Sequence, residues 1–372
     1  MTELLTNLGD APDQVMVERA IAEFRNARPV MIKGAYGSVL VIGIEDIGLR
    51  QAAYLDALAQ GAARLVLPAA RLRTLGLDSR KAGYFPLISI DIARIALLAV
   101  NPEAKADTPV EAAGEADENA LELARLSLVL PAVLVLPLNE QTVIADDVVT
   151  IESDLLHKYR KTAMTKARLI SRAPVPLDKA GKSEFVVFRG GEGMRDQVAI
   201  IVGEPDLSQP VYVRLHSACL TGDLFGSLKC DCGDQLRATV QWMAENEGGI
   251  LLYLDQEGRG NGIANKIRAY RLQAEGYDTY AADEVLGFDL DQRHFEFAAE
   301  MLKQLGVSKV RILTNNPVKI EALQKSGLDV VSDERVLGRL TDENKSYLAT
   351  KRDKAGHLLD YDSFATCAPR KD

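Results

Sequence analysis

The sequence has few cysteines, no surplus of positive charge and no long apolar run. Four cysteines in 372 residues are too few for a disulfide scaffold. The formal net charge of -9 argues against a general nucleic-acid-binding protein, because no basic surplus is available to neutralise phosphates. A local basic pocket for one nucleotide is still allowed. The longest apolar run, residues 126–138, contains Pro131 and Pro137 and is too short to span a bilayer as a helix.

The start of the chain also lacks the features of a secretory signal. Residues 1–13 (MTELLTNLGDAPD) include acidic side chains, and no positively charged start precedes an apolar stretch. We therefore expect a cytoplasmic protein that has neither a membrane nor a nucleic-acid partner. We also expect it to form a homodimer.

The chain is long enough for two domains, and its patterns change near Thr165. Strand and helix candidates alternate on both sides of this point, which predicts an α/β fold for each domain. The second half is expected to be a three-layer α/β domain with a mixed, largely parallel sheet. The predicted domains are residues 1–165 and 166–372. Residues 101–119, rich in alanine, glutamate and proline, are expected to form an exposed loop or a flexible insertion.

Three of the four cysteines, Cys219, Cys230 and Cys232, lie close together in the sequence. Zinc prefers thiolate ligands, and three protein ligands leave the fourth tetrahedral position open for water, as in catalytic sites. Such a water is acidic enough to supply hydroxide near neutral pH. The spacing alone leaves three interpretations open: a catalytic zinc, a structural zinc completed by His216 or Cys367, or a group of buried thiols.

The residues around these cysteines resemble the zinc-site segment of the GTP cyclohydrolase II family. The matching stretches are residues 214–223 (RLHSACLTGD) and 227–236 (SLKCDCGDQL). Further motifs follow in the family's order, and the resemblance extends over roughly residues 168–360. These motifs are QEGRG at residues 256–260, NKIRAY at 265–270, LGF at 286–288, DQR at 291–293 and LTNNP at 313–317.

The resemblance implies a reaction and its cofactors. GTP would bind with Mg²⁺ and lose pyrophosphate, and hydroxide from one zinc ion per subunit would open the purine ring. The guanine C8 would leave as formate, giving 2,5-diamino-6-(5-phosphoribosylamino)pyrimidin-4-one, the product of the first step of riboflavin biosynthesis. Two alternatives remain: a related cyclohydrolase acting on another nucleotide or a pyrimidine riboside, and a non-catalytic, zinc-stabilised nucleotide-binding subunit.

The resemblance also implies the roles of individual residues. Asp291 occupies the position of a proton acceptor, and Arg293 the position of a nucleophile toward the α-phosphate. Tyr270 could donate a proton during ring opening. The zinc ligands would be Cys219, Cys230 and Cys232. The GTP-contacting positions are Arg214, Leu215, His216, Ser217, Ala218, Gln235, Glu257, Gly258, Arg259, Thr279, Thr314 and Lys319.

Simpler structural roles are open for several of these residues. Asp291 could be a first-turn carboxylate favoured by the helix dipole, and Tyr270 a packed aromatic side chain. A guanidinium is almost always protonated, so Arg293 could act through its charge alone. Thr314 could belong to a strand-to-helix turn in which Asn316 caps the helix. Ala218, Asp255 and Asn261 depart from the family pattern, which bears on nucleotide contacts more than on the zinc.

The first domain resembles dihydroxybutanone phosphate synthase, which is fused to GTP cyclohydrolase II in many bifunctional enzymes. The resemblance lies in residues 18–21 (ERAI) and 28–32 (RPVMI). That synthase needs a dense acidic cluster after this strand to hold Mg²⁺ and abstract a proton from ribulose phosphate. Residues 33–38 (KGAYGS) stand there instead and offer no ligand set for a hard cation. We expect a degenerate synthase domain retained for structure, dimerisation or regulation.

The protein is therefore expected to lack synthase activity. Incubation with ribulose 5-phosphate and Mg²⁺ should yield no dihydroxybutanone phosphate above background, because residues 33–38 lack the acidic side chains that would hold the cation. Formation of this product at a rate well above background would show that another acidic group takes over the role.

Overall fold

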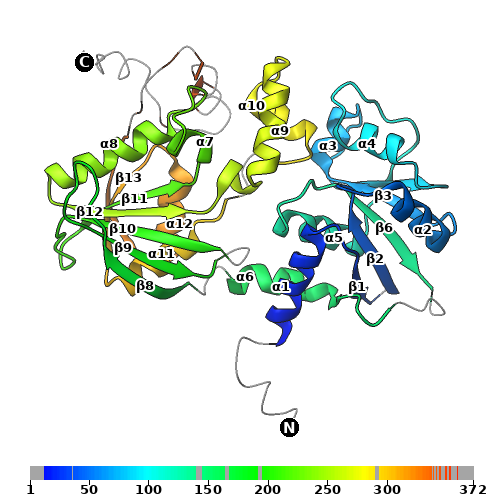
Figure 1. The fold of residues 1–372 in the computed structure, drawn as a ribbon, viewed down its shortest axis with the longest axis horizontal. Helices are drawn as coiled ribbons and strands as arrows, with labels where there is room; N and C mark the ends of the chain where they lie inside the picture. The colour runs from blue at the N-terminus through cyan, green and yellow to red at the C-terminus, as the bar shows by residue number, and fades with distance from the viewer. Residues whose placement is uncertain are drawn as a thin grey trace, which may run out of the picture. The chain divides into compact units, whose positions relative to one another are not determined.

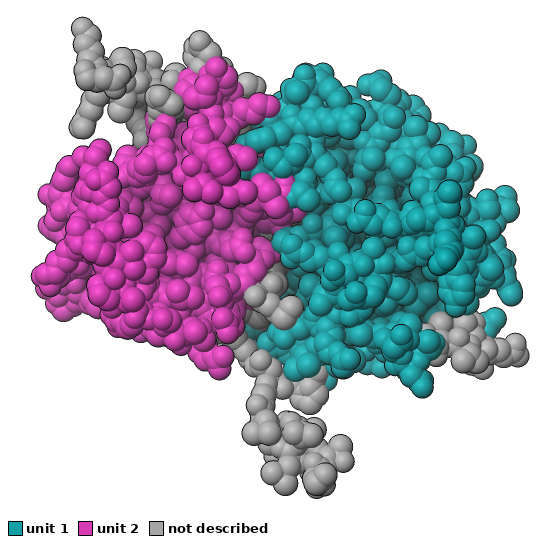
Figure 2. Space-filling view, in the orientation of Figure 1, with its two compact units in different colours: residues 1–162, 264–291 teal, residues 163–263, 292–372 magenta. Residues whose placement is uncertain are grey.

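The computed structural model describes residues 12–35, 37–139, 145–163, 167–191, 195–289 and 293–336, with residues 338, 341, 343–344, 348–349, 352 and 358. The chain forms two compact units, which Figure 2 shows in teal and magenta. Unit 1 comprises Met1–Thr162 and Ala264–Asp291, and unit 2 comprises Ala163–Ile263 and Gln292–Asp372. The predicted domains, 1–165 and 166–372, differ from these units in the placement of Ala264–Asp291.

Unit 1 is built on a seven-stranded sheet in the order β5-β4-β3-β6-β2-β1-β7 (Figure 1). Its pairings are antiparallel apart from the parallel pair β1 and β7. The strands are β1 (Val30–Gly34), β2 (Gly37–Gly43), β3 (Ala63–Leu67), β4 (Gly83–Leu87), β5 (Glu111–Ala112), β6 (Val133–Leu138) and β7 (Thr150–Glu152). The helices are α1 (Pro12–Arg25), α2 (Leu49–Ala59), α3 (Ala69–Thr74), α4 (Ile92–Val100), α5 (Glu115–Leu126), α6 (Ser153–Ala163), α9 (Ile263–Ala274) and α10 (Thr279–Val285).

The loop predicted at residues 101–119 is wrong at Glu111–Ala112, which form strand β5, and in its last part, which is helical. Helix α5 begins at Glu115, and its first turn is acidic, as suits the positive end of the helix dipole. Asp117 and Asn119 are buried, and Asp117 forms an ion pair with Arg64 at 2.8 Å. The ion pair with Arg64 on strand β3 is a tertiary contact that buries a polar residue of α5. The polar composition therefore predicted a loop where the chain forms a packed helix.

Unit 2 is built on a second seven-stranded sheet, in the order β14-β13-β11-β12-β10-β9-β8. The strands β14, β13, β11 and β12 are parallel, and β10, β9 and β8 continue the sheet antiparallel, so the predicted mixed sheet is confirmed. The strands are β8 (Arg168–Pro174), β9 (Ser183–Arg189), β10 (Asp196–Val202), β11 (Val211–Ser217), β12 (Gly249–Leu254), β13 (Lys309–Leu313) and β14 (Asp329–Glu334). The helices are α7 (Leu220–Asp223), α8 (Cys232–Glu245), the 3-10 helix η2 (Glu257–Gly260), α11 (Glu296–Gln304) and α12 (Pro317–Lys325).

Side chains alternate between the two faces of this sheet, which produces three layers. On β12, Ile250 and Leu252 belong to the buried cluster that includes the apolar faces of α11 and α12. Leu251 lies between them in the sequence and belongs to a different cluster, which includes Met243 of α8. Because successive strand residues point to opposite faces, α8 covers one face, and α11 and α12 cover the other. The predicted three-layer architecture is confirmed.

The carboxyl ends of the parallel strands meet at one edge of the sheet. Ser217 at the end of β11 pairs with Leu254 at the end of β12, and β13 ends alongside at Leu313. The chain leaves β11 toward β12 on one side and leaves β13 toward β14 on the other. The position between the carboxyl ends of β11 and β13 is therefore a topological switch point, where open α/β sheets commonly bind ligands.

Among the described residues, no helix is both long and apolar enough to cross a membrane.

Candidate functional site

Three cysteine sulfurs converge at the carboxyl end of β11. Cys219 immediately precedes α7, Cys232 is the first residue of α8, and Cys230 lies just before it. Their sulfur atoms all lie within 4.8 Å of one another, and the Sγ atoms of Cys219 and Cys230 are 3.6 Å apart. Cys219 and Cys230 are buried, whereas Cys232 is half-buried. The cluster could hold a metal ion, and its three soft donors suit zinc.

Two glycines permit this convergence. A Cβ atom at Gly222 would lie 2.7 Å from the sulfur of Cys230 and 3.0 Å from that of Cys219. A Cβ atom at Gly233 would lie 2.1 Å from the carbonyl oxygen of Gly222. The short helix α7 can therefore approach the start of α8 only because neither position carries a side chain.

The electrostatics of the sulfur cluster favour a bound cation. The hydrogen bond with Cys219 is the largest of the influences that raise the pKa of the Cys230 thiol to about 11. Neighbouring thiolates repel one another, and a metal ion removes this penalty because it binds the deprotonated sulfur. Among the described residues, the cluster contains only the three cysteines. Cys367 lies outside the described residues.

His216 does not complete the sulfur cluster. Its Nε2 atom lies 3.1 Å from both carboxylate oxygens of Asp223, and its ring stacks on that of Tyr253 with centroids 5.5 Å apart. Burial lowers the pKa of His216, which favours the neutral ring. The interpretation of a zinc site closed by His216 is therefore wrong for this arrangement.

Asp223 is a buried carboxylate that the sequence analysis did not assign. It accepts hydrogen bonds from the Cys219 backbone N–H at 2.9 Å and from the Tyr253 hydroxyl at 3.0 Å. Together with His216, these contacts tie the cysteine loop to strands β11 and β12. The burial of Tyr253 and the charge of Asp223 both raise the pKa of the tyrosine hydroxyl. Asp223 could have been identified from its place as the last residue of the RLHSACLTGD motif.

Arg214 lies buried at the edge between β11 and β13. Its Nη2 atom donates to Gln235 Oε1 at 2.6 Å, and its Nη1 atom donates to the Leu313 carbonyl at 3.3 Å. Within the described chain, its Nε–H has no hydrogen-bond partner. Desolvation lowers the pKa of Arg214 to about 10, so it remains a cation at neutral pH. Gln235, a predicted GTP-contacting residue, thereby holds the guanidinium in place.

Two further cations lie at the same edge. Lys319 on α12 is buried, and its Nζ atom donates to the Leu215 carbonyl at 2.6 Å. The Nη1 atom of Arg293 donates to Ser217 Oγ at 3.4 Å. Both cations lie over the ring of Phe295, at 5.2 Å for Lys319 and 5.5 Å for Arg293. The structure thus brings the predicted residues Arg214, Ser217, Arg293 and Lys319 to one edge of the sheet.

The glycine-rich stretch after β12 supports the cysteine loop. Glu257 accepts a hydrogen bond from the Leu220 backbone N–H at 2.6 Å and another from Gly258 N–H at 3.0 Å. Gly258 and Arg259 both adopt left-handed backbone conformations, with φ of 61°. Such a conformation costs an arginine roughly 1–2 kcal/mol relative to the right-handed region. Strained residues of this kind cluster at functional sites.

Other predicted contact residues have clear structural roles. The side chain of Leu215 is buried in the sheet core, so its backbone oxygen is the group that meets Lys319. Thr314 Oγ1 accepts from the Asn316 N–H at 3.1 Å, which agrees with the capping alternative. Asn316 caps α12 and Pro317 follows it, so the predicted helix start is confirmed. The Ala218 N–H donates to the Leu254 carbonyl at 2.7 Å.

Three predicted residues are not placed with this group. Tyr270 on α9 and Thr279 at the start of α10 belong to unit 1. Lys266 Nζ lies 5.6 Å from the centroid of the Tyr270 ring. Asp291 lies outside the described residues.

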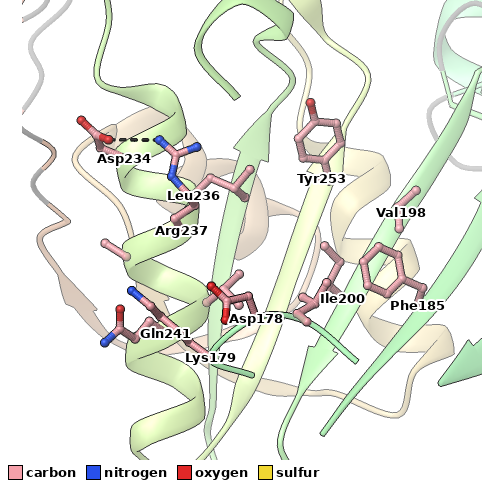
Figure 3. Close-up of a pocket in the computed structure, with 13 residues that line it drawn as sticks. Asp178, Lys179, Phe185, Val198, Ile200, Asp234, Leu236, Arg237, Gln241 and Tyr253 are labelled. Atoms are coloured by element: carbon pink, nitrogen blue, oxygen red, sulfur yellow. Dashed lines mark hydrogen bonds and ion pairs between the residues drawn. The ribbon is translucent and has the colours of Figure 1, made fainter. Parts of the chain in front are cut away.

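A separate cavity of about 630 Å³ lies between α8 and the sheet (Figure 3). Phe185, Val198 and Ile200 line it from the strands, and Leu236 lines it from α8. These walls are mostly apolar and do not suit a triphosphate. The polar edge with Arg214, Lys319 and the cysteines is the better candidate for a nucleotide site.

Comparisons with known proteins identify the family of this chain. The family model for GTP cyclohydrolase II matches residues 167–335. A GTP cyclohydrolase-2 from Xylella fastidiosa is 44% identical over 359 residues, covering 96% of this chain and 90% of that protein. A GTP cyclohydrolase-2 from Azospirillum brasilense is 36% identical over 363 residues, covering 92% of this chain and 94% of that protein. A riboflavin biosynthesis protein RibBA from Bacillus cereus is 44% identical over 211 residues, covering 57% of this chain and 52% of that protein.

Solved structures give weaker matches. RibBX, a two-domain 3,4-dihydroxy-2-butanone 4-phosphate synthase from A. baumannii, is 17% identical with a TM-score of 0.31, covering 87% of this chain and 99% of that chain. A cation-free 3,4-dihydroxy-2-butanone 4-phosphate synthase is 14% identical with a TM-score of 0.32, covering 39% of this chain and 97% of that chain. The two GTP cyclohydrolase-2 relatives, which match more than nine-tenths of the chain, carry the assignment: the chain belongs to the GTP cyclohydrolase II family of riboflavin biosynthesis enzymes.

Proposed function

We propose that this protein is a zinc-dependent GTP cyclohydrolase II that acts on GTP with Mg²⁺. It converts GTP to 2,5-diamino-6-(5-phosphoribosylamino)pyrimidin-4-one and releases formate and pyrophosphate. The observation that carries the proposal is the convergence of three cysteine sulfurs within 4.8 Å of one another, beside buried cations at one edge of the sheet. This combination suits a reaction that needs both an activated water and a site for phosphates.

Cys219, Cys230 and Cys232 would hold the zinc. A zinc ion held by three thiolates acts as a Lewis acid and makes hydroxide available near neutral pH. Asp223 orients the cysteine loop through its hydrogen bond with the Cys219 N–H at 2.9 Å. Such partners of the ligands set the geometry of a metal site.

The buried cations would bind the triphosphate. Arg214 and Lys319 are held in position by the carbonyl oxygens of Leu313 and Leu215. Cations fixed in this way stabilise charge on a leaving pyrophosphate without first having to reorganise. Mg²⁺ would share the phosphate charge, since phosphate oxygens together with water suit this cation. Arg293 remains a hydrogen-bond donor to Ser217, which favours an electrostatic role over a nucleophilic one.

Three residues would handle protons and further contacts to GTP. Asp291 would accept a proton, Tyr270 would donate one during ring opening, and Thr279 would contact the nucleotide. The basic experiment is incubation of the zinc-loaded protein with GTP and Mg²⁺, with formate and pyrophosphate measured separately. Release of both supports the proposal, and release of neither refutes it.

Cys230→Ser should abolish formate release and tight zinc binding but leave the fold intact. One of three ligands is lost, whereas the large apolar core of unit 2 does not depend on the metal. Zinc content, a thermal melt and formate release should be measured on the same preparation, with Cys367→Ser as the control. A variant without zinc that still releases formate would exclude the zinc mechanism, and loss of the cooperative melt would make the zinc structural.

Gly222→Ala should weaken zinc binding although every ligand is retained. The added Cβ would lie 2.7 Å and 3.0 Å from two of the sulfurs, which must move apart. Gly181→Ala is the matched control, because a Cβ there meets nothing within 4 Å and Gly181, like Gly222, is not among the glycines with positive φ. Competition with a chromogenic chelator should show a lower zinc affinity for Gly222→Ala alone. Equal affinity in the two variants would mean that the sulfur positions do not set the metal affinity.

Asp291→Asn should lose most of its turnover but still bind GTP. A proton acceptor matters most in the transition state, so kcat should fall by about a hundredfold or more while the affinity for GTP changes little. Asp289→Asn removes an exposed carboxylate from the same stretch and serves as the control. Wild-type turnover in Asp291→Asn would mean that Asp291 is not the proton acceptor.

A further inference from the structure

A segment of the family's own sequence is packed into the N-terminal unit. The family match spans residues 167–335, but Ala264–Asp291 within it belongs to unit 1. This segment contains α9 and α10, drawn in yellow in Figure 1. Leu130 of the N-terminal region shares a buried cluster with apolar residues of the segment. The cluster includes Ala269, Leu272, Val285, Leu286 and Phe288.

Polar contacts fix the rotation of α9. Asn265 is buried, and its Nδ2 atom donates to the Leu128 carbonyl at 3.2 Å. Arg268 Nη1 lies 2.8 Å from Glu45 Oε1 and 2.6 Å from Asn265 Oδ1. Positions 265, 268, 269 and 272 share one face of a helix, so this face lies on the N-terminal region. Tyr270 lies one position after this face on the same helix.

A buried arginine fixes the carboxyl end of α10. Arg71 is 1% exposed, and its Nη1 atom donates to the Val285 carbonyl at 3.2 Å. The same guanidinium donates to the carbonyls of Leu98 and Asn101, each at 2.7 Å, where α4 ends. It therefore satisfies carbonyl groups at the ends of two helices at once. Arg73 adds an exposed ion pair with Glu284 at 2.8 Å.

The backbone beyond α10 touches the N-terminal region directly. Gly287 has φ of 84°, and an added Cβ would lie 2.9 Å from Pro68 Cγ and 3.2 Å from Pro131 Cγ. Gly276 lies in the turn between α9 and α10, has φ of 102°, and has nothing within 4 Å of an added Cβ. The two glycines share a left-handed backbone but differ in contact with the N-terminal region.

We propose that the N-terminal region is a platform that positions Tyr270 and Thr279 for turnover of GTP. Arg71 and Glu45 are positioning residues, since they act through the helices that carry Tyr270 and Thr279. This inference rests on the proposed function, in which Tyr270 donates a proton and Thr279 contacts GTP. Under this proposal the N-terminal region, whose sequence lacks the acidic cluster of a synthase, has a function in the cyclohydrolase reaction.

The test compares Gly287→Ala with Gly276→Ala in the full-length, zinc-loaded protein. Both changes strain a left-handed residue, but only Gly287→Ala pushes the segment away from Pro68 and Pro131. Relative to Gly276→Ala, kcat/KM for GTP should fall by about tenfold to a hundredfold, through a lower kcat and a higher KM. Zinc content should be unchanged, because the cysteines belong to unit 2. Pro68→Ala, which removes the nearest atom, should restore part of the loss.

A second pair of variants, with smaller effects on the backbone, controls for loss of activity through misfolding. Glu45→Ala removes the partner of Arg268, whereas Glu111→Ala removes a carboxylate that accepts a hydrogen bond from Tyr84, outside the contact with α9 and α10. Only Glu45→Ala should lower kcat/KM. Amide hydrogen exchange of residues 264–289 should also be faster in Gly287→Ala than in Gly276→Ala, whatever the substrate is.

The outcomes separate the two proposals. A wild-type protein that releases no formate from GTP refutes the proposed function, and the hydrogen-exchange comparison still tests the contact. If the wild type is active and Gly287→Ala and Glu45→Ala match their controls in kcat/KM and exchange, the platform role is wrong.

Discussion

The carboxylate of Asp223 is the constraint on which the arrangement of the cysteine loop depends. It is 7% exposed, and a buried charge of this kind is tolerated only when hydrogen bonds replace its hydration. The Cys219 N–H and the Tyr253 hydroxyl provide two such bonds, and His216 lies 3.1 Å away. Because these groups come from the cysteine loop and two adjacent strands, any shift of the loop would leave the carboxylate unsatisfied.

One edge of the sheet contains two separate sets of like charges, the buried cations and the cysteines once they are deprotonated. Arg214 and Lys319 are buried cations held by backbone carbonyls, and the cysteine cluster must lose protons to bind a metal. A zinc ion and the phosphates of a nucleotide would bring in the opposite charges. The protein thereby keeps its charged groups in place before the substrate arrives, which is the condition for electrostatic stabilisation of a transition state.

The residues that match the family model, 167–335, belong partly to unit 1 and partly to unit 2. The three cysteines and the buried cations Arg214 and Lys319 lie in unit 2, whereas α9 and α10 lie in unit 1. Arg71 illustrates why the segment depends on the N-terminal region. Its guanidinium satisfies the Val285 carbonyl, which would otherwise lose its partner when the helix end is buried. The carboxyl end of α10 is therefore stabilised by a side chain of the N-terminal region.

The sequence by itself determined the local features whose cause is local. Alternating strands and helices predicted the three-layer domain, and the Asn316-Pro317 pair predicted the start of α12, because capping depends on adjacent residues. The cysteine spacing predicted a possible metal site. Only the tertiary structure decided that His216 faces Asp223, that Leu215 is a core side chain, and that α9 and α10 belong to unit 1. These outcomes depend on contacts between residues far apart in the chain, which periodicity and spacing do not encode.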